Sequence, residues 1–445
     1  MNFRQSQTLT LLLCAALSLG LPLTAHADDL LAIFNIAKDR DPTLRQAAAN
    51  RKADFEAKPQ SVAALLPNIR ARADTVDNSQ EVQNSGFFPN VSESFNTNSY
   101  AITLTQPLYR HELLVALRQA DSTTQRAEAN FQSARQDLIL RVADAYFNVL
   151  AAIDNLEFAR AEKEATQRQL DDAKQRFDVG LVAITDVLEA QARYDLTVAQ
   201  EITADNTLAN TREALQEITG EYHENLKILR PEIPLLSPDP DSVDEWVKQA
   251  DENNLQLVSA RQTGEIARQE INRQRAGHYP TLDIVAQRSN SVSNSQFGRE
   301  TDTDTIGLEL NVPIFAGGGV VSRTREARYR FQAATEGLEV TRRSVLRQTR
   351  NAYLGVLAGI SRVKALQQAV ISNEKALEAS TAGLEVGTRT IVDVLLTQRE
   401  LFRARASYAR ARYDYILNTL RLKQAAGSLS IDDLSGINAW LQANS

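Results

Sequence analysis

The chain has 445 residues, with 49 Lys and Arg against 56 Asp and Glu, and a formal net charge of −7. This acidic balance argues against nucleic acid as a partner. The only cysteine, Cys14, falls within residues 1–27, so the rest of the chain has neither a disulfide nor a reactive thiol.

Residues 1–27 have the pattern of a secretory signal peptide. Arg4 is their only charged residue, a mostly apolar run covers 9–23, and Ala25-His26-Ala27 provides a small-x-small cleavage site before Asp28. The apolar run is too short for the alternative, a transmembrane anchor. No run of about 18 or more apolar residues follows, so no membrane-spanning helix is predicted. An exported chain of this kind can enter a membrane only as β-strands.

Residues 28–66 are predicted to be mostly helical, with interruptions at Pro42 and Pro59. Apolar and polar residues then alternate over 69–75, which predicts a strand, and again over 100–108, which predicts a second. The residues between these strands are rich in Asn and Ser and are expected to form a polar loop.

Residues 113–179 contain neither proline nor glycine, and their apolar or small residues recur at steps of three and four. This heptad pattern predicts one helix about 100 Å long that packs sideways against other helices. Gly180 is expected to end it, and 184–219 to form a return helix. Because the return helix covers only about half that length, the helices before the strands are expected to complete the layer.

The second half of the chain repeats this order. Its predicted elements are a helix near 243–277, strands at 282–287 and 305–312, a long helix at 320–386 and a return helix at 391–426. Gly387 lies 207 residues after Gly180, and Asp393 lies 207 after Asp186, so the two halves are repeats in register. Four glycines make 320–386 the weaker of the two long-helix predictions.

The chain is therefore expected to divide into three segments. A signal peptide (1–27) precedes a first repeat (28–230), and a second repeat with a C-terminal tail (231–445) follows. Residues 221–240 contain four prolines and are expected to be the linker between the repeats.

Four strands in one chain are too few to close a barrel, for which about eight is the minimum. Two chains would supply about eight, which side chains fill, whereas three would supply about twelve and leave a pore. The residues assigned to one face are small or polar, as a water-filled pore requires: Ala101, Thr103, Thr105, Gly307, Glu309 and Asn311. The sequence therefore predicts an α+β membrane protein that is a trimer.

No pattern for catalysis or metal binding is present. Residues 317–319 are three glycines between a strand and a helix, but the spacing and the Lys-Ser/Thr of a phosphate-binding loop are missing. A flexible connection is the preferred interpretation. His111, His223 and His278 are scattered, so we expect neither an enzyme nor a cofactor.

The turns between the paired helices carry aspartates at equivalent places. Asp186 lies three residues before Glu189, and Thr390 lies three before Asp393, so each pair can cap a return helix. In a trimer each aspartate also occurs three times around one axis, and a ring of carboxylates favours cations.

Arg389 has no counterpart in the first repeat, where the equivalent residue is Val182. An arginine here can reach the carboxylate of a neighbouring turn and hold adjacent hairpins together. The alternative is a solvated surface charge.

Three stretches resemble the TolC family of outer-membrane channel-tunnels: Val-Gly-Leu-Val-Ala-Ile-Thr-Asp-Val at 179–187, Val-Gly-Thr-Arg-Thr-Ile-Val-Asp-Val at 386–394, and Leu-Gln-Glu-Ile-Thr-Gly at 215–220. The resemblance implies a homotrimer with a 12-stranded barrel in outer-membrane lipid and a tunnel of coiled-coil helical hairpins across the periplasm. It implies two kinds of partner, a periplasmic adaptor (membrane fusion) protein and an inner-membrane transporter of the ABC or RND type.

The resemblance also implies roles for residues at the turns. Arg389 would bond Thr185 and Asp186 of a neighbouring chain as a gate latch, and Asp393 would form the constriction ring. Two positions depart from the family pattern. Leu384 stands where the family has a second latch residue, a tyrosine, and Leu396 where it has a second acidic ring.

The sequence thus favours an outer-membrane exit duct for proteins, small toxic compounds or both. The alternative is an exported coiled-coil scaffold or surface protein without a pore. The four duplicated strands favour the duct, because a scaffold does not need them.

Overall fold

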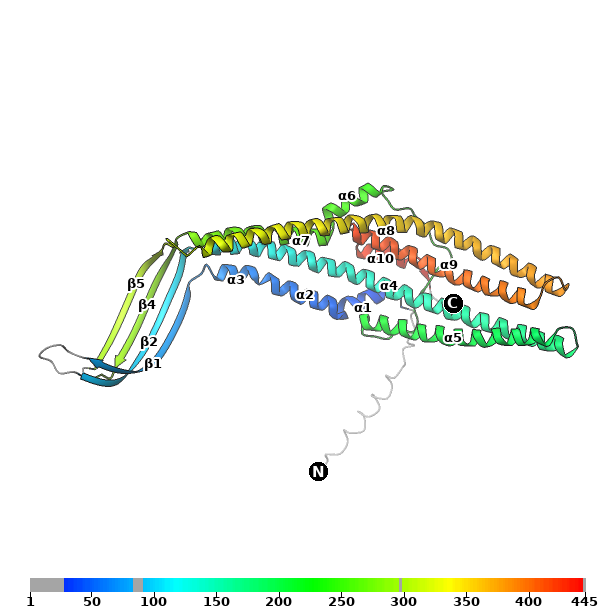
Figure 1. Ribbon diagram of the computed structural model, residues 1–445, viewed down its shortest axis with the longest axis horizontal. Coiled ribbons are helices and arrows are strands. Elements are labelled where there is room, and N and C mark those ends of the chain that lie inside the picture. Colours follow the sequence, from blue (N-terminus) through cyan, green and yellow to red (C-terminus); the bar gives the residue numbers. More distant parts are fainter. Residues whose placement is uncertain (1–27, 83–90, 296–297, 443–445) are drawn as a thin grey trace, which may run out of the picture.

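The computed structural model describes residues 28–82, 91–295 and 298–442. The predicted signal peptide lies outside these residues. The molecule is elongated, with a sheet at one end and long helical hairpins reaching the other (Figure 1). No helix in the described part is long and apolar enough to cross a membrane.

The helices, in chain order, are α1 (Leu30–Arg40), α2 (Pro42–Phe55), α3 (Ala57–Ala63), α4 (His111–Asp178), α5 (Ile184–Thr219), α6 (Val243–Asn253), α7 (Leu255–Arg275), the 3-10 helix η1 (Ala276–His278), α8 (Gly319–Glu385), α9 (Ile391–Ala425) and α10 (Ile431–Asn438). The strands are β1 (Asn68–Val82), β2 (Val91–Tyr109), β3 (Ile228–Leu229), β4 (Thr281–Ser293), β5 (Arg299–Asn311) and β6 (Leu441–Gln442). The four predicted long and return helices are therefore confirmed to within about two residues.

Two helix boundaries differ from the prediction. The break expected at Pro59 falls at Glu56 instead, and Pro59 lies in the first turn of α3, where a missing N–H breaks no helical bond. The helix expected over 243–277 is divided at Asn254. The side-chain oxygen of Asn254 accepts two backbone N–H bonds and so starts α7 as a new helix.

The glycines of α8 do not interrupt it, so the weaker of the two long-helix predictions is also confirmed. A Cβ on Gly359 would lie 3.6 Å from Tyr415, and one on Gly355 would lie 3.7 Å from Asn418. Both contacts are with α9, so these glycines leave space that side chains of α9 occupy. The packing of two helices thus offsets the low helix propensity of glycine.

The long helices form one layer. On the hairpin side α4 packs against α5 and α9, and α8 packs against α9; on the sheet side α4 packs against α2, α3 and α7, and α7 packs against α8. Figure 1 shows α7 in line with α9, and α2 and α3 in line with α5. The helices before the strands therefore complete the layer, as predicted.

The main sheet is antiparallel, with strand order β1-β2-β4-β5. Its strands are longer than predicted, and β2 alone has 19 residues. Residues 76–82 and 91–99, expected in the polar loop, belong to β1 and β2. They carry polar side chains on both faces, so the apolar alternation that predicts a strand is lost while the hydrogen-bonded ladder continues.

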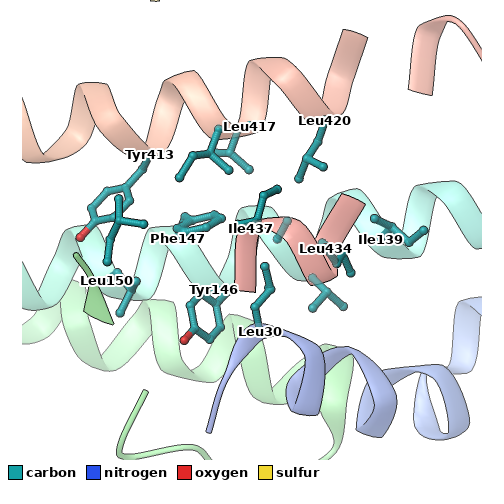
Figure 2. Close-up of a cluster of buried hydrophobic side chains, with 14 of the residues drawn as sticks. Leu30, Ile139, Tyr146, Phe147, Leu150, Tyr413, Leu417, Leu420, Leu434 and Ile437 are labelled. Atoms are coloured by element: carbon teal, nitrogen blue, oxygen red, sulfur yellow. The ribbon is translucent and has the colours of Figure 1, made fainter. Parts of the chain in front are cut away.

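The largest core lies midway along the helices. In Figure 2, buried side chains of α1, α4, α9 and α10 meet, and Phe147 stacks on Tyr413 with ring centroids 5.6 Å apart. The hydroxyl of Tyr146 donates to the Lys227 carbonyl at 2.7 Å. The equivalent Tyr353 donates to Asp241 at 2.9 Å, so both repeats bind the linker region at matching places. The linker also pairs with the C-terminal tail, through β3 and β6.

Candidate periplasmic gate at the hairpin tips

The two hairpin tips share one backbone turn. Gly180 and Gly387 have φ of +76° and +75°, a left-handed conformation that favours glycine. The N–H of Leu181 donates to the carbonyl five residues earlier at 2.8 Å, and the N–H of Thr388 does the same at 2.8 Å. Each long helix therefore ends in the same Schellman motif, which returns the chain into α5 or α9.

The second tip begins its return helix with a capping box. The Asp393 carboxylate accepts bonds from the backbone N–H and the hydroxyl of Thr390, each at 2.9 Å, and the Asp393 N–H donates to the Thr390 hydroxyl at 3.2 Å. These bonds, with the nearby charge of Arg389, lower the pKa of Asp393 below its ordinary value. The predicted capping role of this pair is confirmed.

The first tip lacks such a cap. The residue that precedes α5 is Ala183, which has no side chain able to accept a hydrogen bond. Asp186 is the third residue inside α5, so the prediction that it caps this helix is wrong. The Asp186 carboxylate therefore does not cap α5, whereas the Asp393 carboxylate takes part in the cap of α9.

The side chain of Arg389 lies close against Gly383, a glycine that the sequence analysis did not name. A Cβ on Gly383 would lie 2.7 Å from Cγ of Arg389, so a larger residue there would displace the arginine stem. The first repeat has Arg176 at the position of Gly383 and Val182 at that of Arg389. The sequence does carry a signal for this contact. Only the second repeat has both a glycine in the last turn of its long helix and an arginine in the turn that follows.

The predicted latch residues do not pair inside one chain. Within the described residues, Thr185, Asp186 and Arg389 form no ion pair or side-chain hydrogen bond with one another, and Thr185 and Arg389 are exposed.

The two tips contact each other through apolar side chains. Leu384 at the end of α8 packs in a cluster with Ile391 of α9 and with Leu170 and Ala190 of the first hairpin. Leu384 thus places an apolar side chain against the cluster that joins the two hairpins. Leu396, at the place of the second acidic ring, is 46% exposed.

A buried ion pair joins the stem of the first hairpin, and it too was missed by sequence reasoning. Arg193 of α5 donates to the Glu162 carboxylate of α4, and the two side chains are 14% and 12% exposed. Burial raises the pKa of Glu162 above its ordinary value, against the opposing effect of the Arg193 guanidinium. The pair is 31 residues apart, so only a pairing of two helices could have predicted it.

The chain is similar to known outer-membrane channels along almost its whole length. A model of the family described as outer membrane efflux protein matches residues 33–221 and 246–428. Outer membrane protein TolC of Vibrio cholerae is 41% identical over 94% of both chains. Outer membrane protein TolC of Escherichia coli is 38% identical over 94% of this chain and 86% of its own length.

The fold agrees with this similarity. The crystal structure of the outer membrane protein VceC from Vibrio cholerae superposes with a TM-score of 0.76, at 21% identity, over 89% of this chain and 96% of VceC. The matched family consists of transport channels rather than enzymes. The chain therefore belongs to the outer membrane efflux protein family as a TolC-like channel, lies in the outer membrane with its helical tunnel in the periplasm, and is an outer-membrane exit duct.

Proposed function

We propose that three copies of the chain form the duct, each giving four strands to one 12-stranded barrel with a water-filled pore. The proposal rests on the difference between the two faces of the main sheet. One face carries exposed apolar side chains, and these are Ile69, Tyr100, Ile102, Ile306, Leu308 and Leu310. The opposite face carries small or polar side chains, which include Ala101, Thr103, Thr105, Gly307, Glu309 and Asn311.

Closure between chains follows from the sheet edges. The outer strands are β1 and β5, and in the described residues of one chain each pairs on one side only. An unpaired edge inside a membrane is costly because no water satisfies its backbone groups. Pairing of β1 in one copy with β5 in the next removes every edge.

The wider assembly follows from the division into repeats. We assign 28–230 and 231–445 to the two repeats, each with one hairpin, so a trimer presents six tips to the periplasm. The partners at that end are a periplasmic adaptor protein and an inner-membrane transporter of the ABC or RND type. The cargo consists of proteins, small toxic compounds or both.

The gate lies at the tips. Arg389 of one copy bonds Thr185 and Asp186 of a neighbour, because the first tip leaves its carboxylate uncapped and the second supplies the arginine. Asp393, repeated three times, forms the constriction ring that favours cations. Its capping bonds to Thr390 hold each carboxylate in a fixed orientation.

Conductance and mass test the duct. The purified mature protein is expected to be a trimer in detergent and to form water-filled channels in planar lipid bilayers. A stable monomer or dimer as the only species would contradict the barrel. A trimer that forms no channel would favour the alternative, an exported scaffold.

Arg389→Ser tests the latch. Three symmetric links that together contribute about 1–3 kcal/mol correspond to a 5- to 150-fold change in the closed-to-open ratio, so the variant is expected to conduct more. Arg328→Ser is the matched control, an exposed arginine of α8 near the sheet. Equal conductance of wild type and Arg389→Ser, from equally trimeric samples, would show that helix packing alone closes the tips.

Asp393→Asn tests the ring. The change removes the charge of the ring but keeps an oxygen that can accept the Thr390 bonds, so the helix cap is weakened only slightly. We expect weaker cation preference and weaker block by multivalent cations. An unchanged reversal potential would place the constriction elsewhere.

A further inference from the structure

The apolar face of the sheet changes character partway along each strand. On β5, Ile306, Leu308 and Leu310 are 82%, 69% and 63% exposed. The next residue on the same face is Asp304, which pairs with Arg288 of β4 at 3.7 Å and is itself strongly exposed. The outward face therefore passes from apolar to charged between Ile306 and Asp304.

Strand β2 changes at a different level. Its outward residues Leu104, Ile102 and Tyr100 are followed by Asn98 and Asn96. The change therefore falls between Tyr100 and Asn98.

The pairing register shows that these two levels are offset. Tyr100 stands opposite Asn290, which stands opposite Asp302. In this row the face is apolar on β2 but acidic on β5. Asn290 donates to Asp302 at 3.0 Å and to Glu300 at 3.2 Å, so the polar side chains are bonded to one another.

Strand tilt accounts for the offset. On β1 the change falls between Ala73, which is opposite Tyr100, and Thr75, which is opposite Asn98. From β5 to β1 the change therefore moves by two rows of paired residues on this face, or about 13 Å along the strands, across three strand spacings of about 14 Å. A plane that crosses the strands with this slope is inclined by about 43° to the rows, which is within the usual range of strand tilt in barrels. A flat membrane boundary would produce such a slanted line.

Strand length agrees with this boundary when the hydrocarbon is taken to begin where β2 meets the helices. A tilted strand needs about 9–11 residues to cross the hydrocarbon of a bilayer. Counting about ten residues back from Tyr109, where β2 ends at the helices, reaches Tyr100. The remaining residues of the 19 in β2 extend beyond the hydrocarbon.

We propose that the outer limit of the hydrocarbon crosses β5 between Ile306 and Asp304, and β2 between Tyr100 and Asn98. Below this line the outward face contacts lipid chains. Above it, the face that includes Asp302 and Glu300 stands as a collar in the polar headgroup layer of the outer leaflet. The inference deepens the proposed function, because it requires the apolar face to point to lipid.

Single cysteines in the mature chain test this line, since the natural Cys14 lies in the predicted signal peptide. The probe is a charged, membrane-impermeant maleimide added to intact cells. In the matched pair from one row, Asp302→Cys is expected to be labelled about ten-fold more than Tyr100→Cys, because water is absent from the hydrocarbon. Ile306→Cys is expected to be protected, and Thr305→Cys, on the pore face beside it, to be labelled.

The outcomes separate the boundary from the pore. Equal labelling of Tyr100→Cys and Asp302→Cys would overturn the proposed line. Protection of Thr305→Cys with Asp302→Cys labelled would instead leave the line intact and contradict the pore. Labelling is compared only between variants that reach the outer membrane in wild-type amounts. Ile102→Cys and Asp304→Cys, which also lie in one row, provide a second matched pair.

Discussion

The two hairpins share their backbone turn but are held by different side chains. In the first, Glu162 and Arg193 form a buried ion pair in the stem, while the tip has no cap. In the second, the equivalent residues are Ala369 and Glu400, which cannot form that pair, and the tip carries a capping box. The duplicated turn therefore fixes the shape of both hairpins, whereas their anchoring polar contacts lie in different places.

This difference assigns different tasks to equivalent aspartates. Asp393 is bound by the start of its own helix, so its orientation is fixed within one chain. Asp186 has no such bond and can accept one from a neighbouring chain. An intermolecular latch at the first tip and a fixed ring at the second are the arrangement that this comparison favours.

Arg193→Met is expected to have the largest effect, because it removes the hydrogen-bonded partner of the mostly buried Glu162 carboxylate and leaves only the coulombic attraction of Arg399. We expect local opening of the first hairpin to become easier by about 2–3 kcal/mol. Amide hydrogen exchange in α5 should then accelerate about 30- to 150-fold, while exchange in α9 stays unchanged. Because burial already raises the pKa of Glu162, the defect should be full at neutral pH and shrink as pH falls through the folded-state pKa of this carboxyl.

Two controls sharpen this prediction. The double variant Glu162→Gln with Arg193→Met removes the unpaired charge and should recover most of the loss. Glu400→Gln changes the equivalent position of the second hairpin and should stay within about 0.5 kcal/mol of wild type. A similar loss in both hairpins would show that the ion pair is not the anchor.

Leu384→Ala is expected to have the next largest effect, since it removes a half-buried side chain that packs against the apolar cluster joining the two hairpins. The expected cost is about 1–2 kcal/mol, less than for a fully buried leucine. Its signature is faster exchange at both tips, because the cluster includes Leu170 and Ala190 of the first hairpin. Phe177→Ala, at the equivalent position, is the control, and a change confined to the second tip would contradict a junction through Leu384.

Most of the fold could be predicted from local patterns. Long stretches without proline indicated the paired helices, and the regular spacing of Gly180 and Gly387 indicated two equivalent turns. The strands were predicted at the correct places but too short, because apolar alternation reveals only the part of β1 and β2 that has one apolar face. Hydrogen bonding extends both strands through residues that are polar on both sides.

The site was predicted less completely, for a physical reason. The Thr390–Asp393 cap is local and its spacing reveals it. The contacts of Glu162 with Arg193 and of Leu384 with its apolar cluster depend on which faces of separate helices meet. In the sequence, Gly383 is only one of the four glycines that weaken the helix prediction for 320–386. The room that it leaves for Arg389 becomes visible only when the position of the arginine stem is known.

Exchanging the caps should move stability from one tip to the other. Thr390→Ala removes the capping hydroxyl and is expected to cost about 1 kcal/mol in the first turn of α9. Ala183→Thr introduces one at an extended residue, with φ −80° and ψ 157°, and Asp186 then stands where a capping box needs its acidic partner. We expect slower exchange in the first turn of α5. No gain there would show that backbone geometry, not the missing hydroxyl, leaves the first tip uncapped.

The smallest expected effect is a pH dependence confined to the second tip. The bonds from Thr390 lower the pKa of Asp393 below 3.8 in the folded state, so its carboxylate stabilises the fold above the unfolded value and that contribution is lost as pH falls through the folded pKa. Exchange in the first turn of α9 should therefore differ between wild type and Asp393→Asn at neutral pH, and the two should converge as pH falls through the folded-state pKa of Asp393. Asp186→Asn is the matched control, because Asp186 forms no capping bond, and it should leave exchange in the first turn of α5 unchanged. If the difference at α9 persists to the lowest pH, the neutral carboxyl caps the helix as well as the carboxylate does, and the charge of Asp393 contributes nothing to the cap.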